Sequence, residues 1–233
     1  MERYKFSIAF TLTGLILVIH AIILRSAFFS VFESWCSLSL ICVGASYFFG
    51  SPSVFGKKRD GGIYKVNFVL LLPYFLYVWG VWYIMRLLSK EENYNYLDAG
   101  IWIGRRLVGK EVPDNIELIV DLTSEFAELK SVLYGRNYIC LPVLDGYVPK
   151  KDDFIALLKK VNEFKCDIYI HCAEGHGRTG LVAAALLILK GKAESAEEAL
   201  QKIKLAREKV NLNSDQYNFL SGMINDIRDY IIR

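Results

Sequence analysis

Three long apolar runs dominate the first part of the chain, at residues 6–24, about 28–49 and 66–88. Each approaches or exceeds the ~20 residues that a helix needs to cross ~30 Å of hydrocarbon. The third run contains Pro73 and several tyrosines and tryptophans, which spanning helices tolerate or place at the headgroup level. It shows no polar face at helical spacing. We therefore expect residues 1–90 to form a helical membrane region of two or three spans.

The number of spans stays open because Glu33 lies near the start of the second run. With three spans, the N-terminus and the loop at residues 51–62 would share one side of the membrane, and the C-terminal part would lie on the other. The basic residues next to the spans then divide evenly between the two sides, so the positive-inside rule gives no orientation. With two spans, the C-terminal part would return to the side of the N-terminus.

From residue 91 the pattern changes to that of an α/β domain. Short apolar runs at residues 115–122, 136–143 and 166–171 predict strands, and residues 152–164 carry apolar side chains at helical spacing. Strand, helix and strand in this order favour a parallel sheet. Further helices are expected at 181–190, 195–208 and 214–231. We therefore predict a second domain, residues 91–233, with a central, mostly parallel sheet flanked by helices.

Charge and cysteine content narrow the setting of this domain. Residues 1–90 are basic, whereas residues 91–233 are mildly acidic. The five cysteines show no spacing typical of a secreted disulfide framework. Cys140 and Cys166 lie inside predicted strands, where a core position is expected and a disulfide with Cys172 is the alternative. An integral membrane protein, with a bacterial inner membrane as one suitable setting and the C-terminal domain in a reducing cytoplasm, fits these features best.

The segment HCAEGHGRTG, residues 171–180, carries the candidate chemistry. It follows a strand and precedes a helix, so its glycine-rich loop lies at the carboxyl edge of the sheet, where open α/β sheets bind ligands. Backbone N–H groups of such a loop and of the helix N-terminus form a nest for a phosphate-sized anion. The same surroundings stabilise a thiolate, so we expect Cys172 to be a nucleophile.

Three further residues complete this chemistry. The guanidinium of Arg178 can hold two oxygens of a phosphoryl group, and the Thr179 hydroxyl can donate to the Cys172 sulfur. Asp145 follows the second predicted strand in LPVLDGYVP and is the best candidate for the acid that protonates a leaving oxygen. Asp152 and Asp153 are expected to start a helix instead.

These segments resemble the cysteine-dependent protein tyrosine phosphatases, and in particular their dual-specificity subclass. HCAEGHGRTG matches the His-Cys, five residues, Arg and Ser/Thr signature, and IVDLTSE, CLPVLDGYVP and NLNSDQYNFL match accompanying segments over about residues 96–230. The resemblance implies a phosphocysteine intermediate at Cys172, phosphate binding by Arg178, Asp145 as general acid, and no metal or other cofactor. The loop residues expected to bind substrate are Ala173, Glu174, Gly175, His176, Gly177 and Arg178.

For several residues near the predicted site, the sequence leaves more than one role open. His171 is expected to order the loop rather than act as a base, and for His176 a solvated position is favoured over a substrate contact. Gln216 either helps to place a water molecule or caps a surface helix. Arg105 and Arg106 are expected to be a solvated pair, with a substrate or headgroup contact as the alternative.

The expected activity is that of a membrane-anchored phosphatase acting on phosphoproteins. A phospholipid phosphatase is the first alternative, although the acidic Glu174 disfavours heavily phosphorylated inositol lipids. A phosphate-binding pseudophosphatase is the second. We expect the membrane and a phosphorylated substrate as partners, and no nucleic acid.

Overall fold

A computed structural model describes residues 3–23 and 27–232. Its contacts divide the chain into two compact units. The first comprises Met1–Lys58, Gly62–Ser89 and Ser124–Ala127, and the second comprises Arg59–Gly61, Lys90–Thr123 and Glu128–Arg233. The division therefore falls after Ser89, with two exceptions. Arg59–Gly61 belongs to the second unit, and Ser124–Ala127 belongs to the first.

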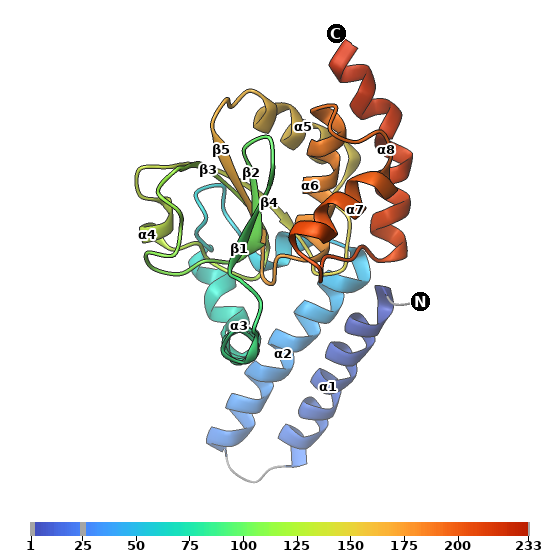
Figure 1. Ribbon diagram of the computed structural model, residues 1–233. Coiled ribbons are helices and arrows are strands. Elements are labelled where there is room, and N and C mark those ends of the chain that lie inside the picture. Colours follow the sequence, from blue (N-terminus) through green and yellow to red (C-terminus); the bar gives the residue numbers. More distant parts are fainter. Residues whose placement is uncertain (1–2, 24–26, 233) are drawn as a thin grey trace. The chain divides into compact units, whose positions relative to one another are not determined.

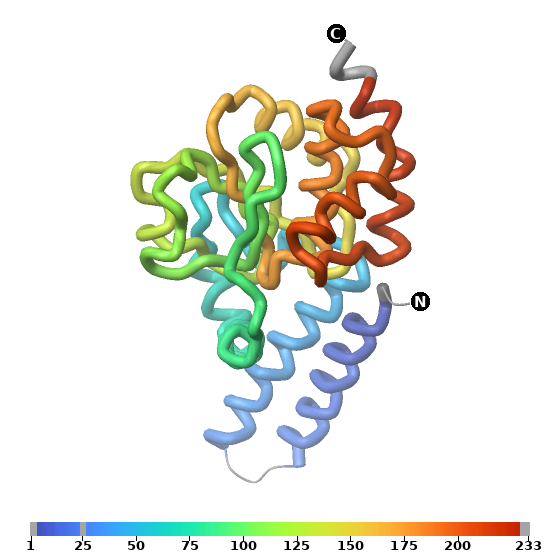
Figure 2. Tube along the Cα trace, viewed as in Figure 1, coloured from blue at the N-terminus to red at the C-terminus, as the bar shows by residue number. Residues whose placement is uncertain are grey.

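The first unit is built from the three apolar runs. They form α1 (Arg3–Ile23), α2 (Ala27–Phe49) and α3 (Lys65–Leu88), and a short 3₁₀ helix, η1 (Pro52–Phe55), follows α2. All three long helices have the length and hydropathy needed to cross a membrane, which confirms an apolar helical region suited to membrane association. α1 and α2 run side by side in opposite directions (Figure 2).

Small residues bring α1 and α2 into close contact. A side chain at Gly44 would lie 2.2 Å from the Thr11 hydroxyl oxygen, so the two backbones can approach only because this position is glycine. The hydroxyl of Ser7 donates to the Gly44 carbonyl at 2.9 Å, and that of Ser37 donates to the Gly14 carbonyl at 2.7 Å. Small residues with interhelical hydroxyl bonds are the usual means by which membrane helices associate.

Glu33, the acidic residue that interrupts the second apolar run, has a partner on the neighbouring helix. Its carboxylate lies 2.8 Å from Nδ1 of His20 in α1. Ionisable groups within apolar helices are usually paired in this way because an isolated charge is costly in hydrocarbon. Glu33 is therefore compatible with a complete α1–α2 hairpin.

α3 runs in a different direction from the other two helices. Figure 1 shows α3 nearly end-on, whereas α1 and α2 are seen along their length. α3 contacts α2 where the Trp35 indole donates to the Val69 carbonyl at 3.0 Å. Further along α3, the Trp79 indole donates to the Glu125 carbonyl at 3.0 Å, and the Phe126 ring packs against both Trp79 and Trp82.

The second unit contains a five-stranded sheet with the order β1-β2-β5-β3-β4 (Figure 1). Its strands are β1 (Tyr94–Asp98), β2 (Ile101–Arg105), β3 (Ile116–Thr123), β4 (Asn137–Val143) and β5 (Asp167–Cys172). Only β1 is antiparallel to its neighbour. The mostly parallel sheet is thus confirmed, and the three predicted strands correspond to β3, β4 and β5. β1 and β2 were not predicted, because each is only five residues long and carries at most three consecutive apolar or aromatic residues.

Helices cover this sheet. α5 (Lys151–Asn162), α6 (Gly177–Leu189), α7 (Ala196–Ala206) and α8 (Ser214–Ile232) share one core with the sheet, and the short α4 (Lys130–Leu133) belongs to a second cluster. α6 lies at the centre of that core, with every residue from Arg178 to Leu189 buried. Ser195 caps α7 as expected, because its hydroxyl oxygen accepts from the Glu198 N–H.

Candidate active site

The loop between β5 and α6 holds the candidate nucleophile. Cys172 is the last residue of β5 and is buried, and α6 begins at Gly177. The N–H of Gly175 points at Cys172 Sγ with an N···S distance of 3.3 Å. The parallel strands β3, β4 and β5 end at the same edge of the sheet, so this loop occupies the expected ligand-binding edge. We call residues 172–178 the phosphate loop.

Arg178 lies in the first turn of α6, and its guanidinium is fixed by the sheet edge. Its Nη1 donates to the Val143 carbonyl at 2.9 Å, at the end of β4. Its Nη2 lies 3.2 Å from the Asp145 carboxylate, whose side chain is 63% exposed. The structure therefore brings the predicted general acid to the predicted phosphate-binding arginine, which shares one loop with the predicted nucleophile.

Gly175 allows the phosphate loop to approach β2 closely, and Gly104 allows β2 to approach the segment before β1. Gly175 has a φ of +76°, in the left-handed region that favours glycine. A Cβ at Gly175 would lie 2.2 Å from the carbonyl carbon of Gly104, and a Cβ at Gly104 would lie 2.3 Å from the Asn93 carbonyl oxygen. The backbone of the loop thus rests directly on the backbone of β2.

Arg207, which directly follows α7, holds the same loop. This buried arginine donates to the carbonyls of Gly175 at 3.2 Å and Glu174 at 3.1 Å. It also donates to the Glu92 carbonyl at 2.9 Å and lies 3.3 Å from the Glu91 carboxylate. Burial lowers the pKa of Arg207, which the Glu91 charge opposes. Arg207 was given no role from the sequence, because a single arginine in a helical segment carries no distinctive signal.

Glu91 also reaches His176, a residue of the phosphate loop. Nε2 of His176 lies 2.9 Å from the Glu91 carboxylate, and the His176 side chain is 28% exposed. The expectation of a solvated His176 is therefore wrong, because an acidic residue 85 positions away in the sequence pairs with it. Burial also raises the pKa of the neighbouring Glu174.

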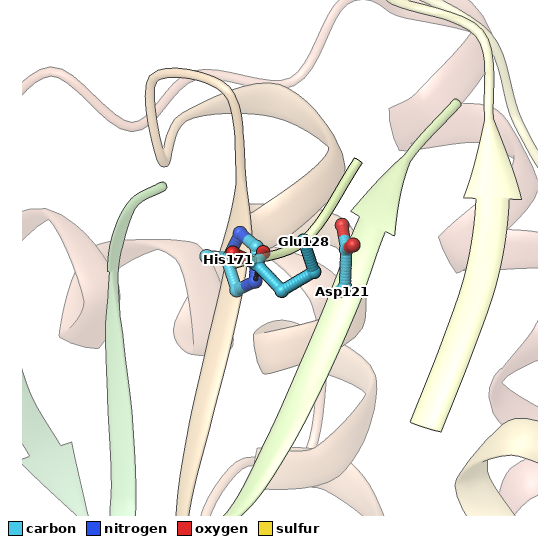
Figure 3. Close-up of side chains that lie close together, drawn as sticks. All are labelled: Asp121, Glu128 and His171. Carbon is cyan, nitrogen blue, oxygen red and sulfur yellow. Dashed lines mark ion pairs between the residues drawn. The ribbon is translucent and has the colours of Figure 1, made fainter. Parts of the chain in front are cut away.

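A buried polar cluster lies behind the nucleophile. Asp121, Glu128 and His171 come together from β3, the segment before α4, and β5 (Figure 3). His171 Nε2 lies 3.3 Å from Glu128, and Nδ1 lies 3.3 Å from the Cys172 carbonyl oxygen. These contacts are compatible with the predicted loop-ordering role of His171. Sequence reasoning missed Glu128, which pairs with His171 only in the folded chain.

The composition of this cluster favours hydrogen bonding over metal binding. One Asp121 oxygen accepts from the Tyr138 hydroxyl at 2.7 Å, and the other accepts from the N–H and hydroxyl of Thr123. Arg106 adds a guanidinium 3.6 Å from Glu128. A cation here would compete with these donors and with the charge of Arg106, so the cluster fits a support for the phosphate loop.

The remaining candidates are placed as follows. Thr179 is buried, and its hydroxyl has no hydrogen-bond partner among the described residues, so the expected bond to the Cys172 sulfur is not formed. Arg105 and Arg106 are 2% and 6% exposed, so the expectation of a solvated pair is wrong. The Arg105 side chain donates to the Glu91 carbonyl at 2.7 Å.

Gln216 is 2% exposed and joins the loop of the candidate acid to α8. Its amide nitrogen donates to the Tyr147 carbonyl at 3.2 Å, two residues after Asp145. Asn213 donates to the Gly146 carbonyl at 2.8 Å and accepts from the Gln216 N–H at 2.9 Å. The start of α8 therefore fixes the acid loop. The Gln216 Oε1 also accepts from the Asn213 N–H at 3.3 Å, so Gln216 does cap the helix, but from a buried position and not at the surface.

Comparisons with known proteins agree with this arrangement. A family model described as "Polymorphic toxin system, DSP-PTPase phosphatase" matches residues 110–192. This matched segment contains Asp145 and the phosphate loop, and it is similar to the dual-specificity phosphatases that the model describes. The chain is 30% identical over 129 residues to "Putative tyrosine phosphatase 197R" of Invertebrate iridescent virus 6, covering 50% of this chain and 47% of the viral protein. It is 40% identical over 81 residues to "Putative tyrosine phosphatase 067L" of Invertebrate iridescent virus 3, covering 30% and 33%.

The aligned residues thus span less than half of the length of each of these viral relatives.

Solved structures of phosphatases share the fold. PTPMT1 in complex with PI(5)P superposes with a TM-score of 0.52 at 19% identity, covering 60% of this chain and 99% of that chain. Tk-PTP in its active form gives 0.53 at 21%, covering 57% and 97%, and DUSP15 gives 0.52 at 18%, covering 60% and 96%. These likenesses confirm the phosphatase-like α/β fold.

Proposed function

We propose that residues 91–233 form the catalytic domain of a membrane-anchored phosphatase, with residues 1–90 as its membrane region. The domain hydrolyses phosphomonoesters through a phosphocysteine at Cys172. The observation that carries this proposal is the convergence at one sheet edge of a thiol facing a loop N–H, a buried arginine and an exposed aspartate.

In the first step, the thiolate of Cys172 attacks phosphorus, and the bond from phosphorus to the ester oxygen breaks. Asp145 gives its proton to the departing oxygen, which avoids release of an alkoxide. Arg178 holds two oxygens of the phosphoryl group and compensates the charge that develops on them. Its bond to the Val143 carbonyl fixes the guanidinium in advance, so little reorganisation is needed.

In the second step, the carboxylate of Asp145 accepts a proton from water while the water oxygen attacks phosphorus. The sulfur–phosphorus bond breaks, inorganic phosphate leaves and the Cys172 thiolate returns. A rotation of the buried Thr179 hydroxyl toward the sulfur would stabilise the leaving thiolate. Arg207 and Glu91 are positioning residues in this scheme, because they hold loop residues rather than the reacting atoms.

The substrates that we favour are phosphotyrosine and phosphoserine or phosphothreonine in proteins. The names of the two viral relatives support a tyrosine phosphatase. Two carboxylates, those of Glu91 and Glu174, belong to or contact the phosphate loop. Negative charge at this position disfavours ligands with several phosphate groups and favours an isolated phosphomonoester.

A phospholipid is the second candidate, and one observation favours it. Glu91, which contacts His176 of the phosphate loop, follows the last residue of α3 by only three positions. Three residues reach at most ~11 Å, so a membrane-associated α3 would keep the loop near the headgroups. Among the proteins of similar fold, PTPMT1 binds PI(5)P in its crystal structure.

The test measures phosphate release by the full-length protein from a phosphotyrosine peptide and from phosphatidylglycerophosphate in mixed micelles. Cys172→Ser should abolish release from both. The substrate with the higher kcat/KM identifies the class, because both candidates share the same chemical step. No release from either substrate by the wild-type protein would overturn the proposal in favour of a phosphate-binding module.

A further inference from the structure

The chain just before α3 is folded into the second unit. Arg59–Gly61 belongs to that unit, although the residues on both sides of it belong to the first. The N–H of Glu128 donates to the Gly61 carbonyl at 2.8 Å. A Cβ at Gly61 would lie 3.0 Å from the Cβ of Glu128 and 3.1 Å from the Tyr138 hydroxyl oxygen, so the contact is tight. This segment ends only four residues before α3 begins.

The chain just after α3 is folded into the same unit. Glu91 and Glu92 follow α3 within four residues and bond to Arg207, and Glu91 also pairs with His176. Arg105 adds a hydrogen bond to the Glu91 carbonyl. These contacts involve buried groups of the phosphate loop and its supports, so they belong to the folded domain and not to a loose linker.

A helix that crosses a membrane must have its ends on opposite sides of ~30 Å of hydrocarbon. Both ends of α3 lead within a few residues into one folded domain, and a folded domain lies on one side of the membrane. From this we propose that α3 does not cross the membrane. It lies in the plane of the membrane surface, on the side of the phosphatase domain, and only α1 and α2 span. The 24 residues of α3 extend about 36 Å along that surface.

The two faces of α3 fit this position. Six exposed apolar or aromatic residues of α3 share one helical face, because at ~100° per residue they fall within about a third of the circumference. They are Val66, Val69, Tyr77, Val81, Ile84 and Leu88. Val66 is 79% exposed and Leu88 is 73% exposed, so this face runs from one end of the helix to the other. An apolar face of this length fits the acyl boundary of a lipid bilayer.

The opposite face of α3 is covered by protein. Leu71, Tyr74, Phe75 and Trp82 are buried there, and Phe126 packs against Trp79 and Trp82. An in-plane helix usually needs a polar face toward water. In α3 the face away from the lipid packs against protein instead of water. Both faces of this helix can therefore be apolar. This explains why its sequence resembles that of a spanning helix.

The direction of α3 agrees with the same position. α1 and α2 form an antiparallel hairpin, whereas α3 runs across them (Figure 1). A third span would be expected to run alongside α2 within ~20–40°. A helix that lies in the surface plane must instead cross a spanning hairpin steeply, as α3 does.

This topology also resolves the orientation. The N-terminus, the loop before α3 and the phosphatase domain then share one side, and the basic residues near the membrane lie there. Those close in sequence to the ends of α1 and α2 are Arg3, Lys5, Lys57, Lys58, Arg59 and Lys65. The three residues that connect α1 to α2 contribute only Arg25. By the positive-inside rule, the phosphatase domain faces the cytoplasm.

The experiment adds one cysteine at a time to the full-length protein, keeps the five native cysteines and expresses each variant in bacterial cells. Accessible thiols are labelled with a membrane-impermeant maleimide of high mass. Arg59→Cys reports the segment before α3, Lys90→Cys the segment after it, and Ser26→Cys the connection of α1 and α2. Each is compared with the wild-type chain, whose own cysteines give the background labelling. Retained phosphate release shows that each variant is folded, since none of the three residues is part of the catalytic machinery.

In inverted membrane vesicles, we expect Arg59→Cys and Lys90→Cys both to be labelled, and Ser26→Cys to be labelled only after detergent is added. Labelling of Arg59→Cys and Lys90→Cys from opposite sides would show that α3 crosses and would overturn the proposal. Labelling of all three from one side would show that the α1–α2 hairpin does not cross, which would overturn the two-span topology. Cytoplasmic orientation fails if the first two are labelled only in spheroplasts.

Discussion

The contact between the phosphate loop and β2 gives a quantitative test of the site. Gly175→Ala imposes two separate penalties on the folded state. The first is conformational, because alanine at φ +76° costs about 1–2 kcal/mol. The second is steric, because the new Cβ would lie 2.2 Å from the Gly104 carbonyl carbon and 2.6 Å from the Arg105 nitrogen. Forcing a methyl group into a packed site costs about 1–3 kcal/mol.

A second glycine isolates the conformational penalty. Gly191, which ends α6, has a similar φ of +65°, but a Cβ there meets nothing within 4 Å. For a chain of this size, 1 kcal/mol corresponds to about 2–4 °C in Tm. Gly191→Ala should therefore lower Tm by about 2–8 °C. Gly175→Ala should lower it by about 4–20 °C, and by at least ~2 °C more than Gly191→Ala.

The two variants should differ more clearly in catalysis. Relief of the steric contact requires the phosphate loop to move relative to β2, and a displacement of ~1 Å can reduce the rate ~100-fold. Gly191→Ala leaves the loop in place and should retain the wild-type kcat. Thermal unfolding in detergent micelles and phosphate release on the same preparations provide both measurements. Equal Tm losses together with an unchanged kcat for Gly175→Ala would refute the close backbone contact.

Three further outcomes follow from the site. Asp145→Asn should reduce kcat/KM, which reports the first step, ~10²–10⁴-fold on an alkyl phosphate but much less on p-nitrophenyl phosphate, whose leaving group needs no proton; equal losses of kcat/KM on both would remove Asp145 as the acid. Glu128→Gln removes the buried carboxylate that faces the Arg106 guanidinium and should lower Tm by about 6–20 °C, from ~3–5 kcal/mol, whereas the exposed control Glu208→Gln should change it by less than ~2 °C. Burial raises the pKa of Glu174 above its unfolded value near 4.5, so the folded state holds this proton to higher pH than the unfolded state does. The free energy of unfolding should therefore fall as pH rises from the unfolded pKa through the folded pKa. Glu174→Gln should remove this decline, and an unaltered dependence of Tm on pH would contradict it.

The sequence alone was sufficient to predict the position of the phosphate loop and three of the five strands of the sheet. Cys172 and Arg178 lie within one contiguous segment, so their juxtaposition depends on local backbone geometry. The three central strands could be predicted because they are short apolar runs between polar segments. Hydropathy likewise identified α1, α2 and α3, because long apolar helices differ from soluble ones in composition.

The residues that hold the loop could not be found in this way. Glu91 reaches His176 across 85 positions, and Glu128 reaches His171 across 43. An isolated glutamate or arginine has the same appearance in a sequence whether it is solvated or buried in a pair. Arg105, Arg106 and His176 were assigned to solvent for this reason, and the fold places partners beside them.

The role of α3 shows the same limit at the level of a whole helix. Its composition determined that it is apolar on every face, but not whether each face meets lipid or protein. Only the folding of Gly61 and Glu91 into one domain distinguishes a helix that lies along the membrane from one that crosses it. The sequence determined the local chemistry and hydropathy because these depend on neighbouring residues. The tertiary structure decided the buried pairs, and the proposed topology rests on it, because both depend on which distant segments meet.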